Sequence, residues 1–329
     1  MLCVMNTSSG SDKSTRDVQT ASATRTDVTA AWRQHAEQLP LQQWPTGALY
    51  VVATPIGNLA DMNLRAIYAL QLADVVAAED TRTSRTLLQA WGIETPLLPA
   101  HRHNEATAAQ AIIARLAQGQ RVALVSDAGT PAISDPGARI VHAVRAAGYR
   151  VIPIPGPSAV IAALMASGMT SDENPAFLFA GFPPPKKHAR QQWLQQWCRL
   201  PVPVVMYESP HRLETTLRDL LAECGPGRQV TLARELTKRF EEITTLPMSE
   251  AGGWLREHAH RSQGEFVLIV EGAPAASGAL DARADELLQA LLETLSVKDA
   301  TRLAARLTGT PRDVLYQRAL ELRGQAEEP

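Results

Sequence analysis

The amino-acid sequence predicts an α/β protein with two domains: a mostly parallel first sheet, a mixed second sheet, and a small C-terminal helical module. Short apolar runs alternate with helical patterns from residue 48 to about residue 170, as in repeated βαβ units. Beyond residue 225, apolar runs follow one another without a long helical pattern between them. Leucines at helical spacing mark the last segment, and 329 residues are enough for two domains and such a module.

The composition is that of a soluble globular protein, with 45% hydrophobic and 20% charged residues. The three cysteines show no CxxC spacing, which excludes a disulfide framework and a cysteine-type zinc site and fits a reducing cytoplasm. No apolar run reaches the length of a membrane span. The net charge is -2, so any RNA binding has to come from local basic patches. We therefore expect a cytoplasmic protein that does not enter a membrane.

Residues 1–46 are rich in Ser, Thr, Ala and Gln and carry scattered charges of both signs. Only residues 28–41 show a weak helical pattern. We expect a disordered leader here. Asp12, Asp17, Asp27 and Glu37 balance the basic residues, which disfavours a mitochondrial transit peptide.

The first domain is expected over residues 47–170. Each strand is a short, buried apolar run, and several helices stop at a glycine such as Gly92, Gly119 or Gly148. The predicted strands are 49–53, 75–78, 121–126 and 151–154, and the predicted helices are 64–72, one closing at 87–91, 105–118, 138–147 and one capped by Ser158.

The second domain is expected over residues 171–273, after a polar, turn-rich boundary at 170–176. Successive strands without an intervening helix indicate that its sheet is mixed. The predicted strands are 177–180, 204–207, 230–233, 241–245 and 265–270, and the predicted helices are 189–199 and 212–223.

The C-terminal module is expected over residues 280–325, after a small-residue linker at 273–278. Three helical patterns are present, and the turn at 308–311 is compatible with a helix-turn-helix. Its charges balance, which favours a structural or docking bundle over nucleic-acid readout.

Common catalytic motifs are missing from the sequence. No GxGxxG, GxxxxGK[ST] or HExxH is present, so the dinucleotide fingerprint, the P-loop and the zincin motif are excluded. Ser158 lies in no GxSxG elbow, and helix capping explains it better. His101 and His103 have no obvious third ligand, so we expect no metal.

Polar loops follow the predicted strands of the first domain, at 54–58, 79–85, 127–137 and 155–158. Open α/β sheets bind ligands beyond the carboxyl ends of their strands. In the 127–137 loop, Gly129 allows close approach to the backbone, while Pro131 and Pro136 stiffen the chain. The loop is acidic and has no phosphate-binding pattern, so it favours a small polar ligand with positive charge.

Seven motifs in order carry a family resemblance, and they stand at Val52–Leu59, Ala78–Arg82, Ser126–Pro131, Pro155–Ala159, Phe179–Pro183, Tyr207–Arg212 and Ala233–Lys238. Over residues 48–272 the chain resembles the ribosomal RNA small subunit methyltransferase I family, a branch of the tetrapyrrole (precorrin-type) methylases. The resemblance implies a two-domain tetrapyrrole-methylase-like fold and a homodimer that binds S-adenosyl-L-methionine between its domains. It also implies 2′-O-methylation of a cytidine ribose in 16S rRNA of the small (30S) subunit.

The resemblance and the loop chemistry together suggest three sets of residues. The expected cofactor contacts are Pro55, Gly57, Ser126, Asp127, Gly129, Thr130, Ile133, Ser134, Ala159, Phe182, Tyr207, Ala233 and Arg234. Asp80 and then Glu105 are candidates for a base or proton acceptor, with Arg82 beside Asp80. The expected RNA contacts are Arg85, Arg102, Lys186, Lys187, Arg190, His211, Arg212 and Lys238.

Structural roles compete with several of these assignments. Asp80 and Arg82 can form an ion pair that only shapes the loop, and Phe182 and Tyr207 can be ordinary packing residues. Two other functions also stay open on the same fold: a methylase acting on a tetrapyrrole or a protein side chain, and a non-catalytic RNA-binding assembly factor. The basic clusters favour RNA, and the intact loops favour catalysis.

Overall fold

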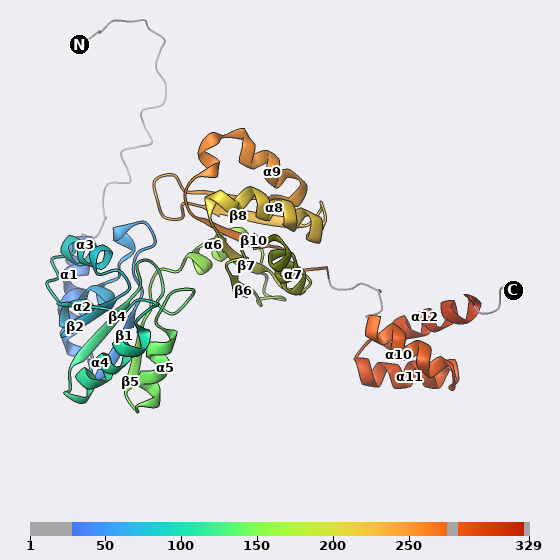
Figure 1. The fold of residues 1–329 in the computed structure, drawn as a ribbon, viewed down its shortest axis with the longest axis horizontal. Coiled ribbons are helices and arrows are strands. Elements are labelled where there is room, and N and C mark those ends of the chain that lie inside the picture. The colour runs from blue at the N-terminus through green and yellow to red at the C-terminus, as the bar shows by residue number, and fades with distance from the viewer. Residues whose placement is uncertain (1–27, 275–281, 326–329) are drawn as a thin grey trace, which may run out of the picture. The chain divides into compact units, whose positions relative to one another are not determined.

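The computed structural model describes residues 28–274 and 282–325. The chain divides into two compact units between Ser158 and Ala159, and we describe each unit by itself (Figure 1). The α/β class, the parallel first sheet, the mixed second sheet and the C-terminal helices are confirmed.

The first unit is built on a five-stranded sheet with the order β3-β2-β4-β1-β5, in which every neighbouring pair is parallel. Its carboxyl ends therefore all meet at one edge. The strands are β1 (Ala48–Val52), β2 (Val75–Ala78), β3 (Leu97–Pro99), β4 (Arg121–Val125) and β5 (Arg150–Ile154).

Helices cover both faces of this sheet because its strands are apolar on both sides. On one face Tyr50 and Val76 pack in a cluster with Leu70 and Leu88. On the other face Leu49 and Leu124 pack with residues of the two remaining sheet-covering helices, including Ile112 and Ile140. The helices are α2 (Leu64–Leu72), α3 (Thr81–Ala90), α4 (Glu105–Ala117) and α5 (Ala138–Ala146), with a short 3₁₀ turn η2 (Leu59–Asp61).

The predicted leader is not wholly irregular. Residues 1–27 lie outside the described residues, but α1 (Val28–Gln38) and the 3₁₀ turn η1 (Leu39–Leu41) follow. Leu39 is buried, and the indole of Trp44 donates a hydrogen bond to its carbonyl. The Trp44 carbonyl in turn accepts hydrogen bonds from Nε and Nη2 of Arg121, both at 3.1 Å. These contacts attach residues 39–46 to the first unit, which the polar composition of the segment did not indicate.

Two features of the first unit differ from the sequence prediction. Strand β3 was not predicted, because it is only three residues long and ends in Pro99. The expected loop at 79–85 is mostly helix, because α3 begins at Thr81 with Asp80 as its N-cap. The side chains of Arg82 and Arg85 therefore project from the first turns of a helix.

The second unit contains a five-stranded mixed sheet with the order β6-β7-β10-β8-β9. Only β6 and β7 are parallel, and the other pairs are antiparallel. The strands are β6 (Leu178–Gly181), β7 (Val204–Glu208), β8 (Gln229–Arg234), β9 (Glu242–Pro247) and β10 (Phe266–Val270). Its helices are α6 (Ala159–Ser167), α7 (Lys187–Trp197), α8 (Pro210–Cys224) and α9 (Met248–Glu257), and η3 (Ala259–Ser262) is a 3₁₀ turn.

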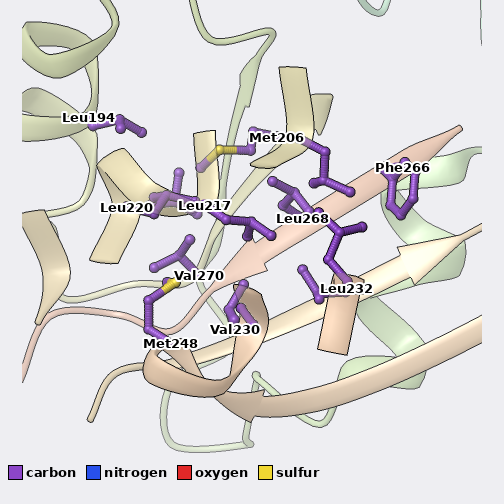
Figure 2. Close-up of a cluster of buried hydrophobic side chains, with 14 of the residues drawn as sticks. Leu194, Met206, Leu217, Leu220, Val230, Leu232, Met248, Phe266, Leu268 and Val270 are labelled. Atoms are coloured by element: carbon purple, nitrogen blue, oxygen red, sulfur yellow. The ribbon is translucent and has the colours of Figure 1, made fainter. Parts of the chain in front are cut away.

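The core of the second unit lies between this sheet and helices α7, α8 and α9. Figure 2 shows Met206, Leu232 and Leu268 from the central strands pointing toward Leu217 and Leu220 of α8. Helix α6 also belongs to this unit, since it contacts β7, β9 and β10. The unit therefore begins before the polar segment at 170–176, where the sequence places the boundary, because the apolar helix α6 packs on the second sheet.

The C-terminal module consists of α10 (Ala282–Leu292), α11 (Val297–Thr308) and α12 (Arg312–Gln325). Leu288, Ala300 and Leu315 form its buried centre. Gly309 ends α11 in the left-handed conformation that a glycine C-cap adopts. An ion pair between Arg318 and Asp285 at 2.7 Å joins the third helix to the first.

Arg190 of α7 is a structural residue of the second unit. Its side chain is 5% exposed and forms a 2.7 Å ion pair with Asp219 of α8. Its Nη1 also donates to the carbonyl of Pro185 at 3.0 Å. The guanidinium is thus buried and fully engaged, so we leave Arg190 out of the RNA-contacting residues that the sequence suggests.

We predict that Arg190→Ala lowers the free energy of unfolding by about 3–5 kcal/mol, because it leaves the carboxylate of Asp219 buried without its partner. The matched control is Arg218→Ala, since Arg218 lies on α8 in an exposed pair with Glu214. Arg218→Ala should lower the free energy of unfolding by less than about 1 kcal/mol. Urea unfolding of both variants measures the difference, and equal losses would contradict the structural role of Arg190.

Candidate functional site

The loops that follow β1 and β4 are joined at the carboxyl edge of the first sheet. The amide of Thr54 donates to the carbonyl of Gly129 at 2.8 Å, and the amide of Gly129 donates back to the carbonyl of Thr54 at 3.0 Å. The hydroxyl of the fully buried Thr54 donates to the carbonyl of Ser126 at 3.2 Å. This bridge fixes both loops where the strands end.

The backbone conformation at position 129 favours glycine. Its φ of +78° is in the left-handed region that disfavours residues with a side chain. A Cβ atom there would be in ordinary van der Waals contact with the loop after β1, 3.4 Å from Cγ2 of Ile56. The two loops therefore lie close together at this position, with room for little more than a Cβ.

Two further contacts hold the loop over residues 126–137. The hydroxyl of Thr130 donates to the carbonyl of Pro157, in the loop after β5, at 3.0 Å. At the other end of the loop the amide of Gly137 donates to Glu105 at 2.8 Å. Between them Ala132 and Ser134 take positive φ values of +70° and +66°. Such strained conformations persist only where the surroundings impose them, and they cluster at functional sites.

Carboxylates gather between the ends of β2 and β4. The amide of Asp80 donates to the side chain of Asp127 at 3.0 Å. The pKa of Glu79 is raised, first by burial and then by the negative charges of Asp127 and Asp135. Burial also raises the pKa of Asp135, and the charge of Asp127 adds to this effect. The positive charge of Arg102 offsets these effects only in part, so the edge favours a further cation.

Sequence reasoning did not single out Glu79 or Asp135 as site residues. Both stand in loops that were recognised, at the end of β2 and within the 126–137 loop. Their partial burial beside Asp127 depends on the pairing of β2 with β4. The available signal was an acidic side chain in each loop, directly after β2 for Glu79 and later in the loop for Asp135.

Asp80 and Arg82 form the ion pair that the sequence allowed as a structural alternative. Nη2 of Arg82 lies 2.7 Å from Oδ2 of Asp80, and Nε lies 3.1 Å from Oδ1. Oδ1 also accepts the Arg82 amide at 2.8 Å as the N-cap of α3. These bonds lower the pKa of Asp80 to about 2. A carboxylate of such low pKa is a weak general base but a stable acceptor.

The remaining first-unit candidates lie around this edge, with different degrees of exposure. Pro55 is half-buried and Gly57 exposed in the turn after β1, while Ile133 and Ser134 are exposed in the 126–137 loop. Glu105 is 8% exposed and holds Gly137, so it positions the loop. The side chains of Arg85 and Arg102 are exposed.

The second sheet also gathers its candidates at one edge. Strand β8 runs in the same direction as β6 and β7, because both β7 and β8 are antiparallel to β10. The residues after these three strands therefore share an edge. Phe182 follows β6, is 54% exposed, and meets the Tyr207 ring edge-on at a centroid distance of 5.3 Å.

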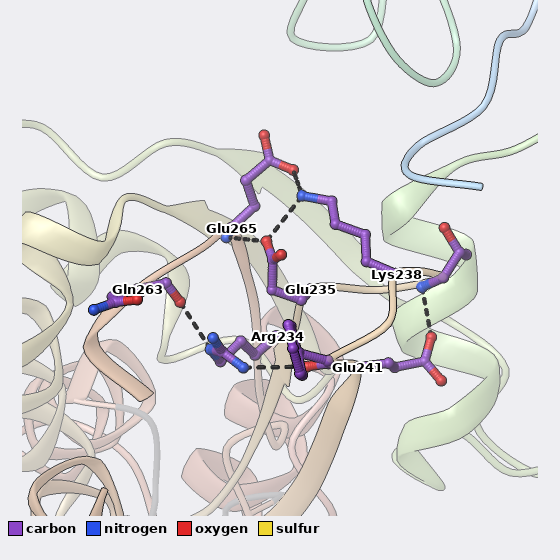
Figure 3. A network of polar contacts seen from close by, with 8 residues as sticks. Arg234, Glu235, Lys238, Glu241, Gln263 and Glu265 are labelled. Carbon is purple, nitrogen blue, oxygen red and sulfur yellow. Dashed lines mark hydrogen bonds and ion pairs between the residues drawn. The ribbon is translucent and has the colours of Figure 1, made fainter. Parts of the chain in front are cut away.

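The loop after β8 is cross-linked by polar contacts (Figure 3). Arg234 is buried, and its guanidinium donates to the carbonyls of Gln263 at 2.8 Å and Phe240 at 3.1 Å. Lys238 pairs with both Glu235 and Glu265 at 2.8 Å. The side chain of Arg234 is thus engaged within the unit, whereas the neighbouring Ala233 is buried in β8.

Apart from the buried Arg190, the basic residues of the second unit that were suggested for RNA fall into two groups. Lys186, Lys187 and His211 are exposed, in the segments that follow β6 and β7. Arg212 is held by a 2.6 Å ion pair with the buried Glu208. Lys238 is held by its two glutamates. The exposed group is the one available to a phosphate.

The described ranges, 28–274 and 282–325, contain neither a cluster of metal ligands nor a membrane-spanning helix. No three His, Cys, Asp or Glu side chains converge as ligands for a metal ion there. No helix in those ranges has both the length and the apolar character needed to cross a membrane.

Two family models match the chain. The model of the tetrapyrrole (corrin/porphyrin) methylases matches residues 48–252, which include both sheets except β10. The model described as the RsmI C-terminal HTH domain matches residues 278–323, over the three C-terminal helices. The fold expected from the sequence motifs is thereby confirmed.

Solved structures share this fold. Cobalt precorrin-4 methyltransferase superposes with a TM-score of 0.51 at 16% identity and covers 70% of this chain and 98% of its own. The methyltransferase CobJ gives a TM-score of 0.52 at 22% identity, over 69% of this chain and 95% of its own.

Curated relatives are much more similar in sequence. The ribosomal RNA small subunit methyltransferase I of Escherichia coli O157:H7 is 47% identical over 278 residues, 84% of this chain and 96% of the relative. The protein of the same name from Pseudomonas aeruginosa is 46% identical over 85% of this chain and 99% of the relative. The chain therefore belongs to the ribosomal RNA small subunit methyltransferase I family of the tetrapyrrole (corrin/porphyrin) methylases, and it is a methyltransferase.

Proposed function

We propose that this enzyme transfers the methyl group of S-adenosyl-L-methionine to the 2′-hydroxyl of a cytidine ribose in 16S rRNA. The observation that carries the proposal is the identity of 43–47% to relatives named for small-subunit rRNA methylation. These matches span more than four fifths of this chain. The exposed basic residues after β6 and β7 suit an RNA substrate better than a tetrapyrrole or a protein side chain.

The carboxyl edge of the first sheet suits this cofactor chemically. The cofactor has a positive sulfonium and a positive ammonium group, and Glu79, Asp127 and Asp135 supply negative charge there. Gly129 offers backbone without a side chain, and the bridge to Thr54 holds that backbone in place. We assign Pro55, Gly57 and the residues of the 126–137 loop to cofactor binding on these grounds.

When bound, the cofactor supplies an electrophilic methyl group, so the protein mainly has to orient the two reactants. Glu79 is a better proton acceptor than Asp80, because burial raises the pKa of Glu79, whereas the pKa of Asp80 is about 2. Asp80, whose pKa is about 2, stays ionised and can accept a hydrogen bond that orients the ribose hydroxyl. Arg82 keeps Asp80 in place.

Several parts of the proposal extend beyond the first sheet. We assign Phe182, Tyr207, Ala233, Arg234 and Ala159 to the cofactor, on the strength of the family motifs. We also propose that the enzyme is a cytoplasmic homodimer whose substrate is the 30S subunit. The cofactor contact of Arg234 would use its backbone, because its guanidinium is bonded within the unit.

A methyl-transfer assay tests the function. Purified enzyme and cofactor with a labelled methyl group are incubated with 30S subunits from a strain that lacks the corresponding activity. Label should appear on the ribose of one cytidine of 16S rRNA. RNA binding without transfer, or label on a porphyrinoid alone, would contradict the proposal.

The role of Asp80 can be tested in the same assay. Asp80→Asn should lower turnover more than it lowers cofactor affinity. Wild-type turnover in this variant would remove Asp80 from the mechanism.

A matched pair of glycine variants tests the cofactor site. Gly129→Val should weaken cofactor binding at least about tenfold, because its two methyl groups extend beyond a Cβ that would already contact Ile56. Gly148→Val is the control, since Gly148 has a similar φ of +84° but no neighbouring atom within 4 Å. Calorimetric titration gives both affinities. Equal affinity in the two variants would place the cofactor elsewhere.

The acidic edge also predicts a pH dependence of cofactor affinity. As the pH falls through the raised pKa of Glu79, its carboxylate becomes neutral and the attraction for a cation is lost. Affinity should therefore begin to fall at a higher pH than an unperturbed glutamate would give. Glu79→Gln should remove this part of the decline and weaken binding at neutral pH. An unchanged pH profile in the variant would exclude Glu79.

A further inference from the structure

The turn between β8 and β9 presents an exposed aromatic ring beside an exposed cation. Phe240 is 66% exposed, although it is one of only five phenylalanines in the chain. The guanidinium of Arg239 lies over its ring at 5.5 Å from the centroid. Neither side chain contributes to the core of the second unit.

Polar contacts hold the backbone of this turn (Figure 3). The Phe240 carbonyl accepts Nη1 of the buried Arg234 at 3.1 Å. The amide of Thr237 donates to the carboxylate of Glu241 at 2.6 Å, and Lys238 joins the turn to Glu265 at 2.8 Å. The backbone around Phe240 is therefore fixed before any partner binds.

The backbone of the turn is also strained. Glu235 and Thr237 have positive φ values of +51° and +65°. A Cβ atom at position 264 would lie only 2.6 Å from the carboxylate of Glu235. This arrangement therefore needs glycine at 264. Strain of this kind is retained where surrounding contacts impose one conformation, often at a binding site.

The turn lies at the sheet edge where β6, β7 and β8 end, as their strand directions require. The exposed cations Lys186 and Lys187 follow β6, and the exposed imidazole of His211 follows β7, at the same edge. A ligand reaching this edge would thus meet an aromatic face together with several positive charges. Single-stranded nucleic acid has both matching features, a stacked base and a phosphate.

We propose that Phe240 is a stacking platform for an unstacked base of the RNA substrate and that Arg239 contacts an adjacent phosphate. The inference rests on the proposed rRNA substrate and assigns a part of its binding surface. Because the backbone that carries the ring is already held, only the side-chain torsions of Phe240 lose freedom on binding, which favours stacking. One ring among charged residues is a small apolar surface for a protein partner, since a stable interface covers about 800 Å² on each side.

The test compares three variants of the full-length enzyme in the 30S methyl-transfer assay. Phe240→Ala should raise the KM for 30S subunits between about 5-fold and about 150-fold, the range of one base–aromatic stack. Its cofactor affinity should stay within about twofold of wild type. Phe240→Trp should keep the wild-type KM, because it retains a stacking face. Phe177→Ala is the control, since Phe177 is 39% exposed just before β6, at the opposite edge.

A second measurement addresses Arg239. Arg239→Gln should reduce the slope of log affinity against log salt by about one, as expected when one phosphate contact is lost. An unchanged KM in Phe240→Ala, or failure of Phe240→Trp to restore it, would overturn the platform. So would dissociation of an oligomer by Phe240→Ala in sedimentation, which would make the ring a protein contact. Absence of methyl transfer by the wild-type enzyme would instead contradict the proposed function.

Discussion

The pair of backbone hydrogen bonds between Thr54 and Gly129 is the constraint on which the first candidate site depends. These two bonds hold the loops after β1 and β4 together, with donor–acceptor distances of 2.8 and 3.0 Å. Thr54 is fully buried, so its polar groups have to be satisfied within the protein, and these bonds and the one to Ser126 satisfy them. Because the bridge fixes Gly129, it also fixes the start of the strained segment around Ile133 and the position of Asp127.

The parallel sheet also determines which charged groups lie at this edge. Parallel strands bring the acidic ends of β2 and β4 together, where like charges and partial burial raise the pKa of Glu79. Arg102 reduces this repulsion only in part, and a bound cation would reduce it further, so the edge favours a cationic ligand. In the second unit the opposite charge is exposed, after β6 and β7, and the fixed turn at Phe240 adds an aromatic surface. The two sheet edges therefore differ in the ligand chemistry that they favour.

The sequence predicted most of the strands because they are short apolar runs between glycine and proline signals. It did not predict β3, which is three residues long, or α9, whose interior contains Gly252 and Gly253. The loops of the first site were predicted from the same strand ends. What a charged residue does there could not be predicted, because burial depends on the folded chain. Arg190 illustrates this: its place among Lys186 and Lys187 suggested RNA, whereas Asp219, far along the chain, buries it in an ion pair.

Hydrogen exchange with and without S-adenosyl-L-methionine tests the central claim most directly, because it reports on backbone amides throughout the chain. If the bridged loops hold the cofactor, its addition should slow exchange in residues 53–58 and 126–137 more than in the rest of the first unit. The helices on the two faces of the sheet, such as α2 and α5, should change little. Protection confined to other segments, with these two loops exchanging as they do in the free enzyme, would contradict this account.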